Sequence, residues 1–215
     1  MKYTTIIFDL DGTLLNTLAD LAAATNYALA EHKLPQRTTD EVRLFVGNGI
    51  RKLIERAVPA DTPAELQEEV FASFNRYYKQ HCADSTRPYD GVPQLLQQLR
   101  AAGCRTAIVS NKADYGVQAL AKQYFDGQLD AACGERAGIA KKPAPDMLLA
   151  IMQQLKAESA NTVYIGDSDT DIATARNAGV DCIGACWGFR GRAFLEEHGA
   201  KLLAENAGDI WELIK

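Results

Sequence analysis

The sequence predicts an α/β protein in which an all-helical segment interrupts a parallel sheet. Through most of the 215 residues, short apolar runs alternate with helical stretches, which is typical of a parallel sheet covered by helices on both faces. Residues 17 to about 82 break this alternation, since they carry three helix-start patterns and no convincing strand. We therefore expect a sheet-containing core from residues 1–16 and 83–215 and a separate helical cap from residues 17–82.

The strands of the core are expected where short apolar runs stop at polar residues. The first run, Thr4 to Phe8, ends at Asp9, and the complete set is residues 4–8, 105–109, 129–132, 162–165 and 181–183. Helices are expected between these runs. Leucines at helical spacing, followed by Gly103, predict a helix over residues 93–102. Pro145 predicts the start of a second helix, and Gly179 the end of a third over residues 170–178.

In the expected cap, three threonines precede an acidic residue at or near capping-box spacing, where a hydroxyl and a carboxylate satisfy orphan backbone N–H groups. The pairs are Thr17 with Asp20, Thr38 with Glu41, and Thr62 with Glu65 after Pro63. Each pair marks the start of a helix.

The composition limits the range of partners. The chain has 28 acidic and 23 basic residues, a formal charge of −5, which disfavours nucleic acid and anionic membranes but allows a small anionic substrate. No run is apolar and long enough to span a bilayer, and no signal-like segment is seen. Five scattered cysteines fit reduced thiols, so a cytoplasmic location is expected. Both a monomer and a homodimer stay open.

Carboxylates follow two of the expected strands. Asp9 and Asp11 come directly after the first strand, and Asp167 follows the strand over residues 162–165. Adjacent strands would bring these acids together, and a Mg²⁺ ion would relieve the cost of burying like charges. Asp169 is expected to cap the following helix. The alternative is that the first two aspartates only cap a turn that Gly12 allows.

Two further clusters could bind phosphate. Ser110, Asn111 and Lys112 follow the strand over residues 105–109, where a hydroxyl, a helix-start N–H and a cation could form a cradle. Lys142 precedes Pro143 in a stiff segment that would fix its direction. Capping roles and a solvent-exposed lysine are the alternatives. Together the four clusters supply a nucleophile, metal ligands and phosphate-oxygen donors, as phosphoryl transfer requires.

In this order, the clusters resemble the four motifs of the haloacid dehalogenase-like hydrolases. The matches are Asp9-Leu10-Asp11-Gly12-Thr13, then Ser110, then Lys142 with Pro143, then Gly166-Asp167 with Asp171. The resemblance implies a Rossmann-like core with the first strand central and a helical cap inserted after the first motif.

The resemblance also implies roles. Asp9 would attack phosphorus, and Asp11 would protonate the leaving oxygen and then activate water. Asp9, the backbone carbonyl of Asp11 and Asp167 would hold Mg²⁺. Ser110 and Lys142 would bind phosphoryl oxygens, with Asn111 and Lys112 beside them, and Asp171 would orient Lys142 or a metal-bound water.

Within the family, the chain is most similar to the phosphoglycolate phosphatases, which implies a small phosphorylated metabolite, 2-phosphoglycolate, as substrate. The residues Leu14 to Thr17 and the pair Trp187-Gly188 fit that group. The cap loop Phe45 to Ile50 is similar as well, so Gly47, Asn48 and the nearby Arg51 are expected to contact substrate.

Several alternatives are open. Pyrophosphatases and nucleotidases of the same family have many of these features. A phosphosugar mutase resembling β-phosphoglucomutase is disfavoured by Thr13 and by the lack of histidine after Asn16. The complete acidic set disfavours a non-catalytic phosphate-binding module. The helical insertion disfavours a phospho-acceptor signalling domain, and Asp11 would have no role in a dehalogenase.

Overall fold

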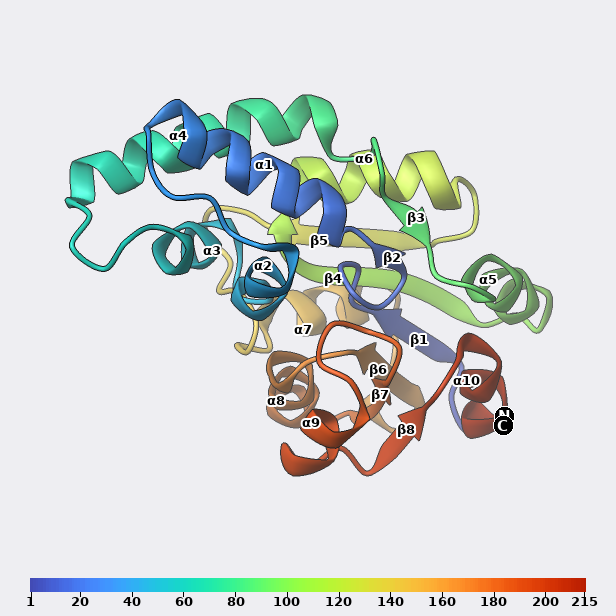
Figure 1. The fold of residues 1–215 in the computed structure, drawn as a ribbon. Helices are drawn as coiled ribbons and strands as arrows, with labels where there is room; N and C mark the ends of the chain where they lie inside the picture. Colours follow the sequence, from blue (N-terminus) through green and yellow to red (C-terminus); the bar gives the residue numbers. More distant parts are fainter. The chain divides into compact units, whose positions relative to one another are not determined.

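The computed structural model describes all residues, 1–215, and the chain divides into two compact units (Figure 1). The first unit consists of Met1–Leu15 and Pro88–Lys215, and the second is Asn16–Arg87. The chain crosses between the units twice. At these crossings β2 (Leu15–Asn16) and β3 (Arg87–Pro88) form a two-stranded sheet.

The first unit is built on a six-stranded sheet in the order β5-β4-β1-β6-β7-β8. All its neighbouring strands pair in parallel, which confirms the predicted α/β fold with a Rossmann-like core. The strands are β1 (Thr5–Phe8), β4 (Arg105–Ala113), β5 (Ala131–Glu135), β6 (Thr162–Gly166), β7 (Asp181–Ala185) and β8 (Leu202–Ala204).

The register of β1 decides which polar residues meet. β1 lies between β4 and β6 (Figure 1). Phe8 is opposite Ile108 on one side and Ile165 on the other. The residues that follow these three positions therefore lie at the same edge of the sheet. Asp9, Ser110 and Asp167 all belong to that edge, where ligands of parallel sheets bind.

Helices cover the sheet and close its core. They are α5 (Val92–Ala101), α6 (Asp114–Phe125), α7 (Asp146–Gln154), α8 (Asp169–Ala178), α9 (Arg192–Glu197), α10 (Ala207–Ile214) and a 3₁₀ turn, Ser159–Asn161. One buried cluster joins Ile7 of β1 and Val109 of β4 to Met147 and Leu148 of α7 and Ala175 of α8. None of the helices is both long and apolar enough to cross a membrane.

The strand β4 is longer than predicted. It runs to Ala113, with a register shift against β5 between Val109 and Ala113, and α6 begins only at Asp114. Ser110, Asn111 and Lys112 are therefore strand residues, and the expectation that they lie at a helix start is wrong. The polar residues did not end the strand because β5 continues to pair beyond them.

The second unit is helical: α1 (Leu18–Glu31), α2 (Thr39–Phe45), α3 (Ile50–Ala57) and α4 (Ala64–His81). Thr38 and Glu41 form the predicted capping box at the start of α2. The other two expected boxes are absent. Thr17 makes no capping bond, and Pro63 occupies the cap position of α4 without one.

Asp20 of α1 has a different task from the predicted capping. Its buried carboxylate accepts hydrogen bonds from the N–H groups of Ser85 and Thr86, at 2.9 and 2.8 Å, and from the Thr86 hydroxyl at 2.8 Å. This carboxylate joins the beginning of the second unit to its end.

Candidate active site

Three buried carboxylates meet at the carboxyl ends of β1 and β6. Oxygen atoms of Asp9, Asp167 and Asp171 all lie within 4.8 Å of one another. Two of the three, Asp9 and Asp167, are predicted metal ligands. The adjacency of β1 and β6, which the sequence could only assume, is what brings them together.

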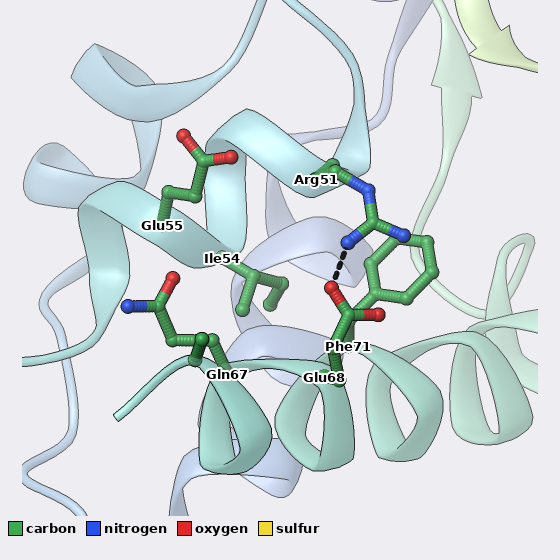
Figure 2. A pocket seen from close by; sticks show the side chains of 7 residues that line it. Arg51, Ile54, Glu55, Gln67, Glu68 and Phe71 are labelled. Atoms are coloured by element: carbon green, nitrogen blue, oxygen red, sulfur yellow. Dashed lines mark hydrogen bonds and ion pairs between the residues drawn. The ribbon is translucent and has the colours of Figure 1, made fainter. Parts of the chain in front are cut away.

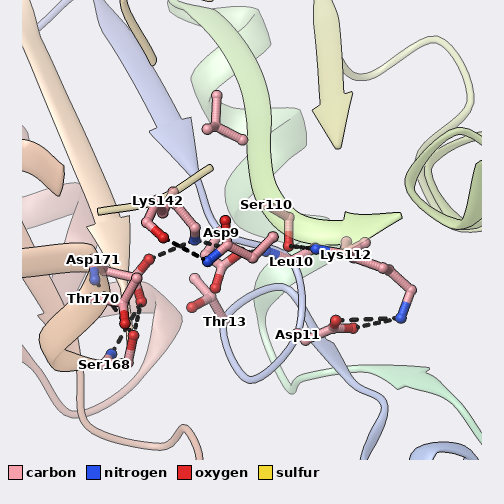
Figure 3. Close-up of polar contacts among 12 residues, drawn as sticks. Asp9, Leu10, Asp11, Thr13, Ser110, Lys112, Lys142, Ser168, Thr170 and Asp171 are labelled. Carbon is pink, nitrogen blue, oxygen red and sulfur yellow. Dashed lines mark hydrogen bonds and ion pairs between the residues drawn. The ribbon is translucent and has the colours of Figure 1, made fainter. Parts of the chain in front are cut away.

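The environment of Asp9 holds its carboxylate in one place and raises its pKa. The Leu10 N–H donates to Oδ1 at 2.7 Å, and the Lys142 ammonium lies 3.0 Å from the same oxygen (Figure 3). Burial raises the pKa of Asp9 to about 6, with the charges of Asp171 and Asp11 adding to the rise while Lys142 and a hydrogen bond from Ser110 oppose it. At neutral pH Asp9 is therefore largely an anion.

Asp167 is fixed from two sides. Its oxygens accept hydrogen bonds from the Thr13 hydroxyl at 3.2 Å and from the Phe189 N–H at 2.8 Å. Burial, together with the charges of Asp171 and Asp9, raises the pKa of Asp167 well above its usual range. The close approach requires glycine nearby, because a Cβ at either Gly12 or Gly188 would overlap the Asp167 side chain.

Lys142 is the cation at the centre of the site. Its Nζ donates to Asp171 at 2.7 Å and to the Tyr164 hydroxyl at 2.9 Å, in addition to its contact with Asp9. Burial opposes the charge on Lys142, but the nearby Asp171 and Asp9 outweigh it and raise its pKa. Lys142 is therefore a permanent cation in the site.

Tyr164 is a site residue that the sequence reasoning missed. It lies in β6, is fully buried, and donates its hydroxyl proton to the Val109 carbonyl at 2.7 Å, so that the oxygen can accept from Lys142. The available signal was a hydroxyl between the apolar residues Val163 and Ile165, in a strand that ends at an acidic motif.

Asp171 orients Lys142 and also belongs to a helix cap. Ser168, not Asp169, is the cap residue of α8, and Asp171 is the third residue of its capping box. The expectation that Asp169 caps this helix is wrong, because the helix begins at Asp169 and only the preceding side chain can reach the free N–H groups. Gly166 leaves the space that the Asp171 side chain occupies.

The side chain of Asp11 is not part of the carboxylate cluster. Both of its oxygens instead accept hydrogen bonds from the Lys112 ammonium, at 3.0 and 3.2 Å (Figure 3). Only the backbone carbonyl of Asp11 is then left for the predicted metal contact. The neighbouring loop is held by Trp187, whose ring N–H donates to the Thr13 carbonyl at 3.0 Å.

The three residues of the predicted phosphate cradle make different contacts in the structure. Ser110 hydrogen bonds to Asp9. Asn111 donates from its side-chain amide to the Lys142 carbonyl at 3.0 Å, so it holds the backbone of the lysine. The predicted cradle is thus brought to the site, with Lys112 directed at Asp11.

The three residues expected to contact substrate from the cap all lie in the second unit. Arg51 lines a pocket between α3 and α4, where it pairs with Glu68 and its guanidinium lies 4.4 Å from the centre of the Phe71 ring (Figure 2). Asn48 accepts a hydrogen bond from Arg56 at 2.8 Å, and Gly47 adopts a positive φ of 121°. Their contact with substrate stays a prediction.

The donor set suits a divalent cation. Asp9, Asp167 and Asp171 offer three buried carboxyl groups, against one ammonium, that of Lys142. Buried like charges are unfavourable unless a cation compensates them, and carboxylate oxygens are the ligands that Mg²⁺ prefers. The residues therefore fit a magnesium ion bound by Asp9 and Asp167.

Comparison with known proteins agrees with this chemistry. Residues 6–185 match the family model of haloacid dehalogenase-like hydrolases. A phosphoglycolate phosphatase of Xanthomonas campestris is 32% identical, with 96% of this chain and 94% of the relative aligned. An N-acetylmuramic acid 6-phosphate phosphatase of Pseudomonas aeruginosa is 31% identical over 88% of this chain and 84% of the relative.

A solved structure has the same fold over the whole chain. A predicted phosphoglycolate phosphatase from Lactobacillus delbrueckii subsp. bulgaricus superposes with a TM-score of 0.93 and 36% identity, covering 100% of this chain and 99% of that one. With the family model matched and relatives aligned along nearly their full length, the chain belongs to the haloacid dehalogenase-like hydrolases.

Proposed function

We propose that this protein is a magnesium-dependent phosphatase that hydrolyses a small phosphomonoester, 2-phosphoglycolate first among the candidates. The observation that carries the proposal is the position of Asp9 at the end of β1, with Lys142 at 3.0 Å and the Asp167 carboxylate within 4.8 Å. Several relatives that match most of the chain are phosphoglycolate phosphatases, which supports this substrate. The muramic acid phosphatase among them supports sugar phosphates as the second candidate class.

In the first step, an oxygen of Asp9 attacks the phosphorus atom of the ester. The bond between phosphorus and the ester oxygen breaks as the Asp9–phosphorus bond forms, and Asp11 gives its proton to the departing alkoxide. Lys142 is directed at Asp9 by Asp171 and Tyr164, so its charge lies where the phosphoryl oxygens gather negative charge. The Ser110 hydroxyl lies beside Asp9 to donate to the same group.

In the second step, water hydrolyses the acyl phosphate. Asp11, now a carboxylate, takes a proton from the water as its oxygen bonds to phosphorus, and the bond to Asp9 breaks. The products are inorganic phosphate, the Asp9 carboxylate and protonated Asp11, so the enzyme returns to its starting state.

Asp9, the Asp11 carbonyl and Asp167 would hold the magnesium ion, which would offset phosphate charge while bound. Thr13, Phe189 and the two glycines around Asp167 would fix that ligand in place. The carboxylate of Asp167 would therefore need little rearrangement to bind the ion.

We further propose that residues 17–82 act as the cap that selects substrate, with Gly47, Asn48 and Arg51 as its contact residues. Substitution of Asn48 and Arg51 should change the ranking of phosphate esters more than the turnover of p-nitrophenyl phosphate. An unchanged ranking would remove these residues from the proposal. A cytoplasmic location and a monomeric or homodimeric state belong to the same proposal.

The central experiment is substitution of the nucleophile. Asp9→Asn keeps the size of the side chain but removes the attacking anion, so turnover with Mg²⁺ should fall by several orders of magnitude. Mass spectrometry after acid quench of the native enzyme should find an added phosphoryl group on Asp9. Asp126→Asn, at an exposed position, is the matched control and should behave as the native enzyme. Near-normal turnover of Asp9→Asn would refute the mechanism.

A further inference from the structure

The contact between Lys112 and Asp11 assigns Lys112 a task that the sequence did not suggest. The ammonium donates to both oxygens of the Asp11 carboxylate, at 3.0 and 3.2 Å. We propose that Lys112 is a positioning residue for Asp11, which it holds ready to accept a proton from water, rather than a ligand of the phosphate. This inference rests on the proposed function, because it assumes that Asp11 is the acid and base of the reaction.

The place of Lys112 in the fold favours a fixed role. Its side chain is only 2% exposed, and that of Asp11 is 13% exposed. A buried ammonium is unfavourable without a carboxylate partner, and Asp11 supplies one. The pair is therefore held by burial, unlike an exposed ion pair that exchanges with solvent.

Gly116 of α6 leaves room for this arrangement. A Cβ at Gly116 would lie 3.3 Å from Cε of Lys112 and 3.6 Å from both Cδ and Cγ. Glycine inside a helix is less favourable than alanine by about 1 kcal/mol. Gly116 does not have a positive φ, so its backbone conformation does not require glycine. The space that it leaves for the Lys112 side chain is therefore the physical reason for a glycine at this position.

The contact between Lys112 and Asp11 favours the second step of the proposed reaction, the hydrolysis of the phosphoenzyme. Both Asp11 oxygens accept from the ammonium, and an ammonium holds a carboxylate more strongly than a neutral acid. A carboxylate is the form that takes a proton from water while the phosphorus–Asp9 bond breaks. Lys112 should therefore matter more for hydrolysis of the phosphoenzyme than for its formation.

The test uses p-nitrophenyl phosphate, whose leaving group needs little protonation in the first step. Lys112→Met, and Lys112→Gln as a second variant that keeps a donor without charge, should lower kcat by about 10- to 100-fold, as loss of an orienting partner commonly does. Formation of the phosphoenzyme should stay fast. We expect a burst of p-nitrophenolate and an added phosphoryl group on Asp9 after acid quench, while inhibition by inorganic phosphate stays unchanged.

A double-mutant cycle separates this inference from the proposed function. If Lys112 acts through Asp11, Lys112→Met should lower kcat by less than about twofold in an Asp11→Asn background. A native-like rate for Asp11→Asn alone would refute the proposed function. A slow Asp11→Asn enzyme in which Lys112→Met still causes its full loss would overturn only the inference. If Lys112→Met instead weakened inhibition by inorganic phosphate and gave no burst, Lys112 would be a phosphate ligand. That result would also overturn the inference and leave the proposed function standing.

Discussion

Replacement of Tyr164 by phenylalanine removes one buried oxygen from the centre of the site and leaves the shape of the ring. That oxygen accepts from Lys142 at 2.9 Å and donates to the Val109 carbonyl at 2.7 Å. A hydrogen bond to a charged group contributes about 1.5–3 kcal/mol and a neutral one about 1 kcal/mol, so the free energy of unfolding should fall by about 3 kcal/mol. For a chain of this size, each kcal/mol lowers Tm by about 2–4 °C, which gives a loss of about 6–12 °C.

Activity should fall as well, because Lys142 loses one of the groups that direct it. Asp171 and Asp9 still contact the ammonium, so we expect kcat to fall by about 10- to 100-fold rather than to disappear. Tyr27→Phe is the matched control, since Tyr27 is 41% exposed and would keep its stacking on Tyr77. Calorimetry and steady-state kinetics measure both effects. A Tyr164→Phe protein with native Tm and native kcat would refute the assigned role.

Two other regions give predictions of their own. Asp20→Ala leaves the N–H groups of Ser85 and Thr86 without their carboxylate partner. The free energy of unfolding should therefore fall by about 1–3 kcal/mol for each donor that stays buried. An unchanged midpoint of urea unfolding would contradict this prediction. Burial raises the pKa of Asp9 to about 6 and raises the pKa of Asp167 well above its usual range, so protons compete with the cation for both carboxylates as pH falls. The increase in Tm caused by Mg²⁺ should accordingly be larger at about pH 7.5 than at about pH 5, and an equal increase at both values would exclude these carboxylates as ligands.

The sequence predicted the elements whose signals are local. Each of the five expected strands is present, because a short apolar run with a polar stop is visible without knowledge of its neighbours. The capping box of Thr38 and Glu41 is equally local, and it formed. By contrast, β8, α9 and α10 were not predicted. These elements span only Leu202–Ala204, Arg192–Glu197 and Ala207–Ile214, and segments so short carry little periodic pattern.

The sequence also determined which residue types gather at the site, because the strand ends carry the carboxylates and parallel strands end at one edge. Only the tertiary structure decided which charge meets which. Lys142 is joined to Asp9 and Asp171, Lys112 to Asp11, and Asp20 to the far end of its own unit. The physical reason is that a buried charged side chain needs an oppositely charged partner close in space, and the fold decides which residue that is. The register of β1 between β4 and β6, and the room left by a few glycines, select partners such as Asp11 and Lys112, which are 101 positions apart in the chain.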